Sequence, residues 1–179
     1  MSGYRRCAGP ARRSLDGMTT FTAHPVPARV LAELRDCDDA GRKPVPFTDE
    51  EGGAPLRCCL RHSVPGETIA LVSYAPLRRW AAATGADPGA YDEQGPVFIH
   101  AGECAGPASQ ELPFTRAHRV LRRYSDQGHI LGGRLVERGF AAALAEAFDD
   151  PAVAFVHVRA VEYGCFYYEV RRGRPLVSP

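Results

Sequence analysis

A histidine and a glutamate occupy two successive strand-like segments near the C-terminal end of the chain. His157 lies in AVAFVHVRA (152–160) and Glu169 in CFYYEVRR (165–172), and both segments are rich in β-branched and aromatic residues. The register that gathers their apolar residues on one face places His157 beside Glu169. A carboxylate beside an imidazole fixes the tautomer and raises the basicity of a general base. The alternative interpretation is an ordinary polar contact between strands on a solvated face.

The same register groups the neighbouring side chains of these strands. Arg159 and Tyr167 are expected on the face of His157, and Phe166 on the opposite face with Tyr168. Cys165 follows Gly164, and glycine at a strand start lets a ligand or another backbone approach closely. A thiol there could act as a nucleophile if a neighbouring cation favoured the thiolate. Equally, a buried cysteine is an inert small apolar residue.

Several arginines lie on strand-like segments rather than in linkers. Arg57 and Arg123, with Tyr124 beside the latter, could converge on a carboxylate or phosphate if their strands are neighbours. Against this, 21 of the 22 basic residues are arginine, since Lys43 is the only lysine. That bias suits a GC-rich coding genome, so most of these arginines need no ligand to explain them.

Cysteine and histidine also supply the donor types of a zinc site. The candidates are Cys58, Cys59, His62, His100 and Cys104, but no C-x-x-C occurs in the sequence. If LRCCLR (56–61) is a strand, the side chains of the two adjacent cysteines point to opposite faces. They are then poorly placed to bind one ion together. No metal site is therefore predicted, and a zinc protein remains an alternative.

Size and charge limit the function classes. A chain of 179 residues suits one domain, and a formal net charge of +1 argues against a nucleic-acid partner. No apolar run approaches the roughly 20 residues that span a bilayer. Without an export signal, the cysteines are expected to be reduced and the protein cytoplasmic. Residues 1–17 are predicted to be a disordered extension, and residues 18–179 a single α+β domain.

Hydrophobic periodicity and chain breakers place the elements that must carry these residues. Helices are expected at 27–37 and 139–148 and a short one at 78–84, with strands at 19–24, 56–61, 67–74, 97–100, 117–124, 130–136, 152–160 and 165–172. The predicted fold is α+β, with a mostly antiparallel sheet covered on one face by the two longer helices. The open face would then carry the site.

The order of several short motifs resembles one bacterial protein family. PLRCCLR, PGETIALVSY, GPVFIH, RRY and DPAVAFVHVRAVEYGCFYYEVRR follow one another as in domain of unknown function 1203, over about residues 21–172. The resemblance implies a small α+β domain and carries no reaction, cofactor or partner. Its first motif reads P-C-R-x-C-L, and Leu56 stands here where the first cysteine would be, which argues against a two-cysteine site. His100 and Cys104 lie outside the pattern. The matched polar positions are Arg57, Cys59, Arg123, Tyr124, His157, Gly164, Cys165 and Arg171.

Three functional hypotheses remain open at this point. The first is an enzyme or binding protein for a small anionic metabolite, with Arg57 and Arg123 as anion contacts and His157 as base. No cofactor is identified. The second is an interaction module, in which the aromatic strand 166–168 pairs with a partner or with a second copy to form a homodimer. The third is a Cys/His zinc-binding protein.

Overall fold

Ten strands and three α-helices make up the part of the chain that the computed structural model describes, residues 21–109 and 111–173. Their order is β1 (Phe21–His24), α1 (Ala28–Asp36), β2 (Phe47–Asp49), β3 (Pro55–Leu56), β4 (Arg61–His62), β5 (Glu67–Tyr74), α2 (Pro76–Thr84), the 3-10 helix η1 (Gly89–Tyr91), β6 (Gly95–His100), β7 (Arg119–Tyr124), β8 (Ile130–Val136), α3 (Phe140–Asp149), β9 (Phe155–Ala160) and β10 (Phe166–Arg172). Residues 1–17, predicted to be a disordered extension, lie outside the described residues.

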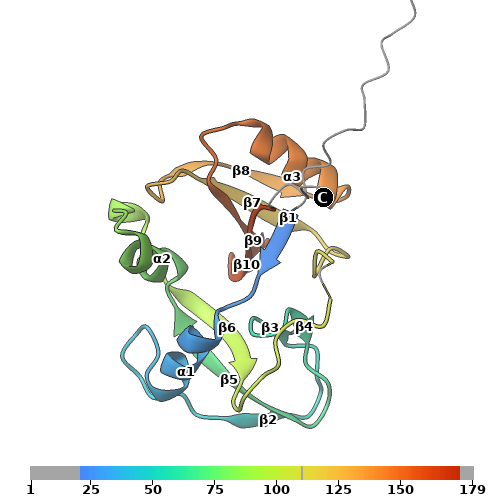
Figure 1. The fold of residues 1–179 in the computed structure, drawn as a ribbon. Helices are drawn as coiled ribbons and strands as arrows, with labels where there is room; N and C mark the ends of the chain where they lie inside the picture. The colour runs from blue at the N-terminus through green and yellow to red at the C-terminus, as the bar shows by residue number, and fades with distance from the viewer. Residues whose placement is uncertain (1–20, 110, 174–179) are drawn as a thin grey trace, which may run out of the picture.

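The strands form two separate sheets (Figure 1). Sheet A has the order β1-β10-β9-β7-β8 and sheet B the order β2-β5-β6-β3-β4. All pairs are antiparallel except β3 with β6. An α+β fold with mostly antiparallel strands is therefore confirmed. The prediction of a single sheet was wrong, because strand periodicity shows which residues pair in a ladder but not which strands are neighbours.

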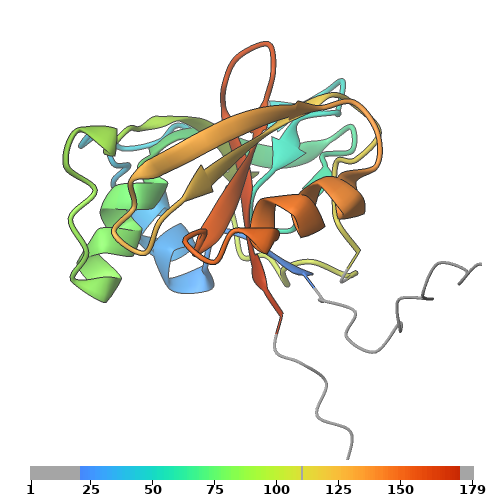
Figure 2. The ribbon, with the colours of Figure 1, turned by 90° about the horizontal axis from the view of Figure 1, so that it is seen from above.

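Each sheet has its own helix, so the prediction that two helices cover one face was also wrong. The apolar stripe of α1, with Leu34, packs against Ile69 and Val72 of sheet B. The stripe of α3, with Leu144, packs against Val158 of sheet A. Figure 2 shows α2 and α3 toward opposite ends of the molecule. Among the described helices, none is long and apolar enough to cross a membrane.

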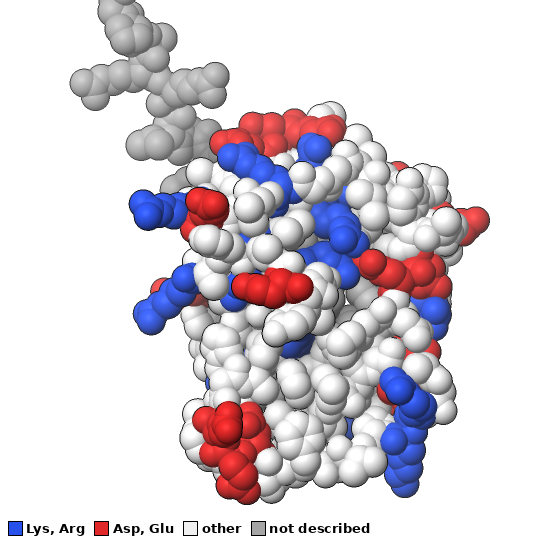
Figure 3. Space-filling view, turned by 180° about the vertical axis from the view of Figure 1, so that it is seen from behind, with Lys and Arg blue, Asp and Glu red and all other residues white. Residues whose placement is uncertain are grey.

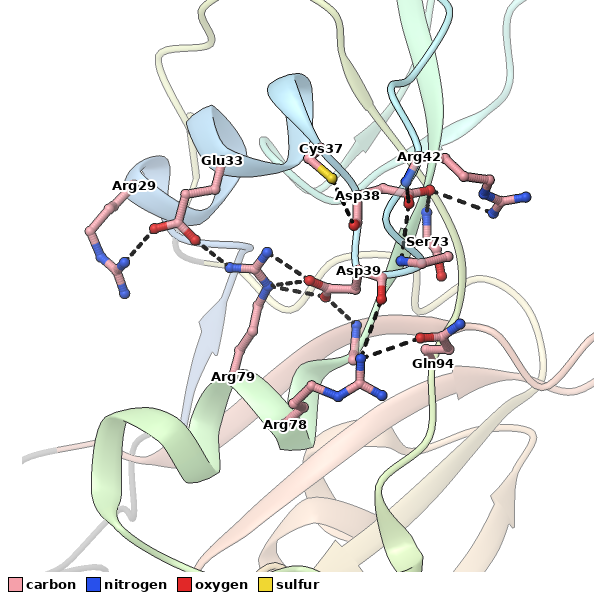
Figure 4. Close-up of polar contacts among 12 residues, drawn as sticks. Arg29, Glu33, Cys37, Asp38, Asp39, Arg42, Ser73, Arg78, Arg79 and Gln94 are labelled. Carbon is pink, nitrogen blue, oxygen red and sulfur yellow. Dashed lines mark hydrogen bonds and ion pairs between the residues drawn. The ribbon is translucent and has the colours of Figure 1, made fainter.

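Helix α2 is held at the junction of the sheets by a network of ion pairs (Figure 4). Arg79 on α2 contacts Asp39 at 2.7 Å and Glu33 of α1 at 2.6 Å. The backbone N–H of Ala75, just before the helix, donates to Asp39 at 2.7 Å. On its other side, the ring of Trp80 packs at a tilt against Phe155 of β9, with ring centroids 4.9 Å apart. The helix therefore bridges α1 and sheet A.

Strand β10 is an internal strand of sheet A. It pairs with β1 on one edge and with β9 on the other, and Phe166 and Tyr168 are buried. The ladder with β9 includes Phe166 and Tyr168, whereas the ladder with β1 covers only Glu169–Arg172. The aromatic side chains of Phe166 and Tyr168 fill the two cores and are not free for a partner. Pairing of this strand with a partner or a second copy stays a prediction.

Candidate metal centre and predicted binding residues

Cys58 and Cys59 lie in the tight turn 57–60 between β3 and β4, not in a strand. Leu60 closes this turn with a left-handed φ of 57°, and its backbone N–H donates to the carbonyl of Leu56 at 3.0 Å. The alternation of side chains holds only for extended backbone. The two Sγ atoms accordingly lie 3.9 Å apart on the same side of the turn.

The end of β6 brings His100 to these thiols. Because β3 runs parallel to β6, the backbone N–H of Arg57 donates to the carbonyl of Phe98 at 2.9 Å. One step further along, the N–H of His100 points at Cys58 Sγ, 3.4 Å away. His100 Nδ1 lies 3.3 Å from Cys58 Sγ and 3.9 Å from Cys59 Sγ. The loop after β6 adds Cys104, so four donor atoms lie within 4.8 Å of one another.

A carboxylate orients the imidazole of His100 from its other nitrogen. Nε2 lies 3.3 Å from Glu67 Oε1. Arg61 binds both oxygens of Glu67, at 2.5 and 3.0 Å, and lowers the pKa of this carboxyl to about 2. The ionised carboxylate accepts the Nε2 proton and leaves the Nδ1 lone pair directed at the thiols. Histidines that bind metals in proteins are oriented in this way.

Three sulfurs and one imidazole nitrogen form the donor set of a tetrahedral zinc site. Zinc bound to thiolates at about 2.3 Å holds its sulfurs about 3.8 Å apart, which matches the separation of Cys58 and Cys59. The thiol of Cys58 donates to Cys59, which raises the pKa of Cys58 and lowers that of Cys59. With four protein ligands the coordination shell is closed, as in structural rather than catalytic zinc sites.

The predicted pairing of His157 with Glu169 is confirmed, but not on an open face. The two residues are directly opposite in the ladder, and His157 Nε2 lies 3.6 Å from Glu169 Oε2. His157 is only 1% exposed, and its ring packs against Tyr124 and Phe166 at 4.6 and 4.9 Å. The face that carries this pair is turned toward the junction of the two sheets, so any substrate must reach it through Glu169.

Burial of His157 predicts acid sensitivity of the fold. Burial lowers the pKa of His157 below its usual 6.5. The carboxylates of Glu169 and Glu93 oppose this shift, whereas the positive charge of Arg159 adds to it. The unfolded chain therefore binds a proton that the folded chain does not, and stability falls as the pH drops below about 6.5. The slope is at most about 1.4 kcal/mol per pH unit for one histidine.

Urea unfolding at a series of pH values below about 6.5 measures this slope. His157→Gln should flatten it, whereas the exposed His118→Gln should leave it unchanged. An unchanged slope in His157→Gln would show that His157 is protonated in the folded state.

A β-bulge in β10 moves the predicted site residue Tyr167 and its neighbour Phe166 to other faces than expected. The register shifts between Phe166 and Tyr168, so that Phe166 pairs with Arg159. Phe166 therefore joins the face of His157, and Tyr167 leaves it to pack against Phe114 at 4.9 Å. The expected faces of Phe166 and Tyr167 were wrong because the inserted residue reverses the alternation.

The remaining predicted residues do not converge on one site. Arg123 lies on the α3 side of sheet A, where it contacts the carbonyl of Leu131 at 3.4 Å. Its neighbour Arg122 is the one opposite His157. Arg159 donates to the carbonyl of Gly164 at 2.8 Å, and the thiol of Cys165 contacts the carbonyl of Tyr163 at 3.7 Å. Tyr124 is fully buried beside His157.

Arg57 instead joins a second arginine around Tyr167. The guanidinium of Arg57 lies 4.7 Å from the centre of the Tyr167 ring and that of Arg119 lies 4.5 Å from it. Arg57 Nε also donates to the carbonyl of Phe166 at 2.8 Å and so connects sheet B to β10. Burial lowers the pKa of Arg57 to about 10, which leaves it charged at neutral pH.

Comparison with known proteins places this chain in a family. The model of "Protein of unknown function (DUF1203)" matches residues 53–172, which is more than half of the 179 residues. The chain belongs to the DUF1203 family. The match confirms the resemblance seen in the motifs, and all four residues of the Cys/His cluster lie inside it. No curated protein and no solved structure matched the chain.

The four residues were among the zinc candidates in the sequence, but no joint site was predicted because the segment 56–61 looked like one strand. A usable signal was present in the sequence. Two adjacent cysteines are followed by an H-x-x-x-C motif, whose histidine ends the second strand-like segment after them. Adjacent cysteines become joint ligands only when the backbone turns at them. The left-handed residue that makes this turn is a leucine, which does not signal a turn as glycine or asparagine would.

Proposed function

We propose that this DUF1203 protein binds one Zn²⁺ ion through Cys58, Cys59, His100 and Cys104, and that the ion has a structural role. The proposal rests on one observation, the four donor atoms within 4.8 Å of one another. The orientation of His100 by Glu67 supports it. The ion would hold the β3–β4 turn to the end of β6 and the loop that follows it, which lie 42 residues further along the chain, counted from Cys58 to His100.

Metal analysis of protein purified without a histidine tag tests this proposal. One zinc per chain is expected for the wild type and for Cys37→Ser, an exposed cysteine outside the cluster. Cys104→Ser should lose most of the metal. Cobalt(II) should give the charge-transfer and visible bands of a tetrahedral thiolate site only in the first two proteins. Metal-free wild-type protein that also shows no such bands with cobalt would refute the proposal.

The orientation of His100 predicts the effect of its carboxylate partner. Glu67→Gln should weaken zinc binding by about 10- to 100-fold, because it replaces the charged acceptor that fixes the imidazole tautomer with a neutral amide. Competition with a chromogenic chelator measures this change. Glu51→Gln is a suitable control, because Glu51 is an exposed carboxylate outside these contacts. Equal zinc affinity in both variants would mean that Glu67 does not orient the ligand.

A second candidate function is the binding of a small anion at Arg57 and Arg119. These side chains belong to residues that are 3% and 6% exposed, and within the described residues neither forms an ion pair with a carboxylate. On the face shown in Figure 3, basic and acidic side chains are interspersed. Arg119 Nε is also buried without a hydrogen-bond partner. Two buried cations without a counter-charge are unfavourable unless an anion neutralises them.

Thermal unfolding in inorganic phosphate, against chloride of equal ionic strength, tests the anion site. Phosphate at about 100 times its dissociation constant should stabilise the wild type by about 2.7 kcal/mol. Arg119→Met should lose this stabilisation and, without phosphate, should be as stable as the wild type or more so. The exposed Arg134→Met should respond like the wild type. A phosphate response that survives in Arg119→Met would place the anion elsewhere.

A further inference from the structure

A cleft of about 650 Å³ opens between helices α1 and α2, away from the Cys/His cluster. Val30 and Glu33 of α1 line one wall, and Arg79, Trp80 and Ala83 of α2 line the other. The floor comes from sheet A, through His24 of β1 and Phe166, Glu169 and Arg171 of β10. The volume of the cleft is in the range of pockets that bind small organic molecules.

A buried carboxylate lies at the floor of this cleft. The side chain of Glu169 is 13% exposed, and one of its oxygens accepts a hydrogen bond from Arg171. The other oxygen faces His157, which is buried behind it. Burial opposes ionisation of Glu169, but His157 and Arg171 outweigh it and keep the pKa of this carboxyl below its usual value. Glu169 therefore presents an ionised acceptor whose position is fixed from behind.

The arginines around the cleft carry no charge that is free for an anion. Arg29 and Arg79 share Glu33, and Arg79 is also bound by Asp39 (Figure 4). Arg171 is paired with Glu169 itself. His24 sits opposite Glu169 in the ladder, and burial lowers its pKa, so it is neutral at pH 7. An anion therefore finds no unpaired arginine among these residues, whereas the oxygens of Glu169 keep further lone pairs for hydrogen-bond donors.

Aromatic side chains form much of the remaining lining. Tyr74 and Phe166 lie side by side at the floor with ring centroids 5.5 Å apart, and Trp80 lines the α2 wall. Val30, Pro25 and Pro76 add apolar surface. Flat rings stack favourably on such side chains, and buried aromatic surface dominates the affinity of small ligands. A planar ligand is therefore favoured.

We propose that this cleft binds a small planar aromatic molecule that carries N–H donors, neutral or cationic, with those donors on the Glu169 carboxylate. The ring would lie against Tyr74, Trp80 and Phe166. The cleft shares none of its lining residues with the Cys/His cluster or with the Arg57 and Arg119 pair. The inference therefore stands independently of both proposals above.

Two probes of the same size and opposite charge test the class of ligand. Benzamidine carries planar N–H donors and a positive charge, whereas benzoate carries only acceptors and a negative charge. Saturation-transfer NMR and calorimetric titration of the full chain should detect benzamidine and not benzoate. Glu169→Gln should weaken benzamidine binding at least about tenfold, because a hydrogen bond to a buried charged group is lost. Glu162→Gln, an exposed carboxylate in the β9–β10 turn, should not.

A second variant separates binding from folding, since Glu169 also contacts His157. Ala83→Trp puts a large side chain into the mouth of the cleft from an exposed position of α2 and leaves the floor intact. It should abolish benzamidine binding in a protein that unfolds like the wild type. The proposal is overturned if benzoate binds as well as benzamidine, if neither probe binds, or if benzamidine binding survives in both Glu169→Gln and Ala83→Trp.

Discussion

Removal of the proposed zinc ion is expected to lower the free energy of unfolding by about 4 kcal/mol or more. A ligand held at about 1,000 times its dissociation constant stabilises the folded state by about 4.1 kcal/mol, and structural zinc sites reach higher ratios. Without the ion, the β3–β4 turn and the loop with Cys104 lose the metal–ligand bonds that would hold their cysteines to His100. Urea unfolding of the protein as purified, after chelation, and after return of zinc measures the change.

Treatment of two cysteine variants with a chelator tests whether the change in stability comes from the Cys/His cluster. Cys104→Ser should already be destabilised and should not respond to the chelator, whereas Cys37→Ser should respond like the wild type. Proteolysis should become faster in the loop 101–109 before it does in sheet A, because that loop leaves β6 at the site itself. If wild-type protein that contains zinc unfolds at the same urea concentration after the metal is removed, the ion has no structural role.

The strand pair that carries His157 shows how far the sequence could predict the fold. Alternation of apolar side chains correctly gave the register of His157 and Glu169, because a slip of one residue would bury the wrong face. The same rule failed two residues earlier, where the bulge at Tyr167 reverses the alternation. A bulge adds one residue without changing the composition of the strand, so alternation alone cannot reveal it.

The division into two sheets depended on contacts that no local pattern contains. The ladder between β5 and β6 and the ladder between β9 and β10 look alike in sequence, and both were expected in one sheet. They are separated because β6 pairs with the short strand β3 on its other edge, and β9 pairs with β7. The same long-range pairing brings His100 to Cys58, which is why the Cys/His cluster becomes apparent only in the folded chain.

Arg57 illustrates the same point for the candidate anion site. Its position on a strand-like segment predicted a ligand contact beside Arg123, yet Arg57 lies in the β3–β4 turn and Arg123 near the far end of β7. The partner that the fold supplies is Arg119, four residues earlier in the same strand β7. Arg119 and Arg123 share one face of β7, so the choice between them depends on which end of that strand lies beside Arg57 and Tyr167, and the alternation of side chains does not show this.

Truncation of Phe155 is expected to cost about 3–5 kcal/mol of stability, the usual cost of Phe→Ala in a core. Phe155 is 2% exposed and forms a small separate cluster with Leu77 and Tyr124. Its ring stacks on Tyr124 at 5.1 Å and packs at a tilt against Trp80 at 4.9 Å, so it connects sheet A to helix α2. Removing the ring leaves a cavity between two elements that have few other contacts with each other.

Trp80 is the only tryptophan in the chain, so its fluorescence reports directly on this joint. In Phe155→Ala the emission should shift to the red and the urea midpoint should fall, while Leu131→Ala on the exposed side of β8 should change stability by about 0.5 kcal/mol or less. Because the other side of Trp80 lines the cleft, Phe155→Ala should also weaken benzamidine binding without touching Glu169. A loss below about 1 kcal/mol with unchanged emission would mean that the ion pairs of Arg79 alone hold α2 in place.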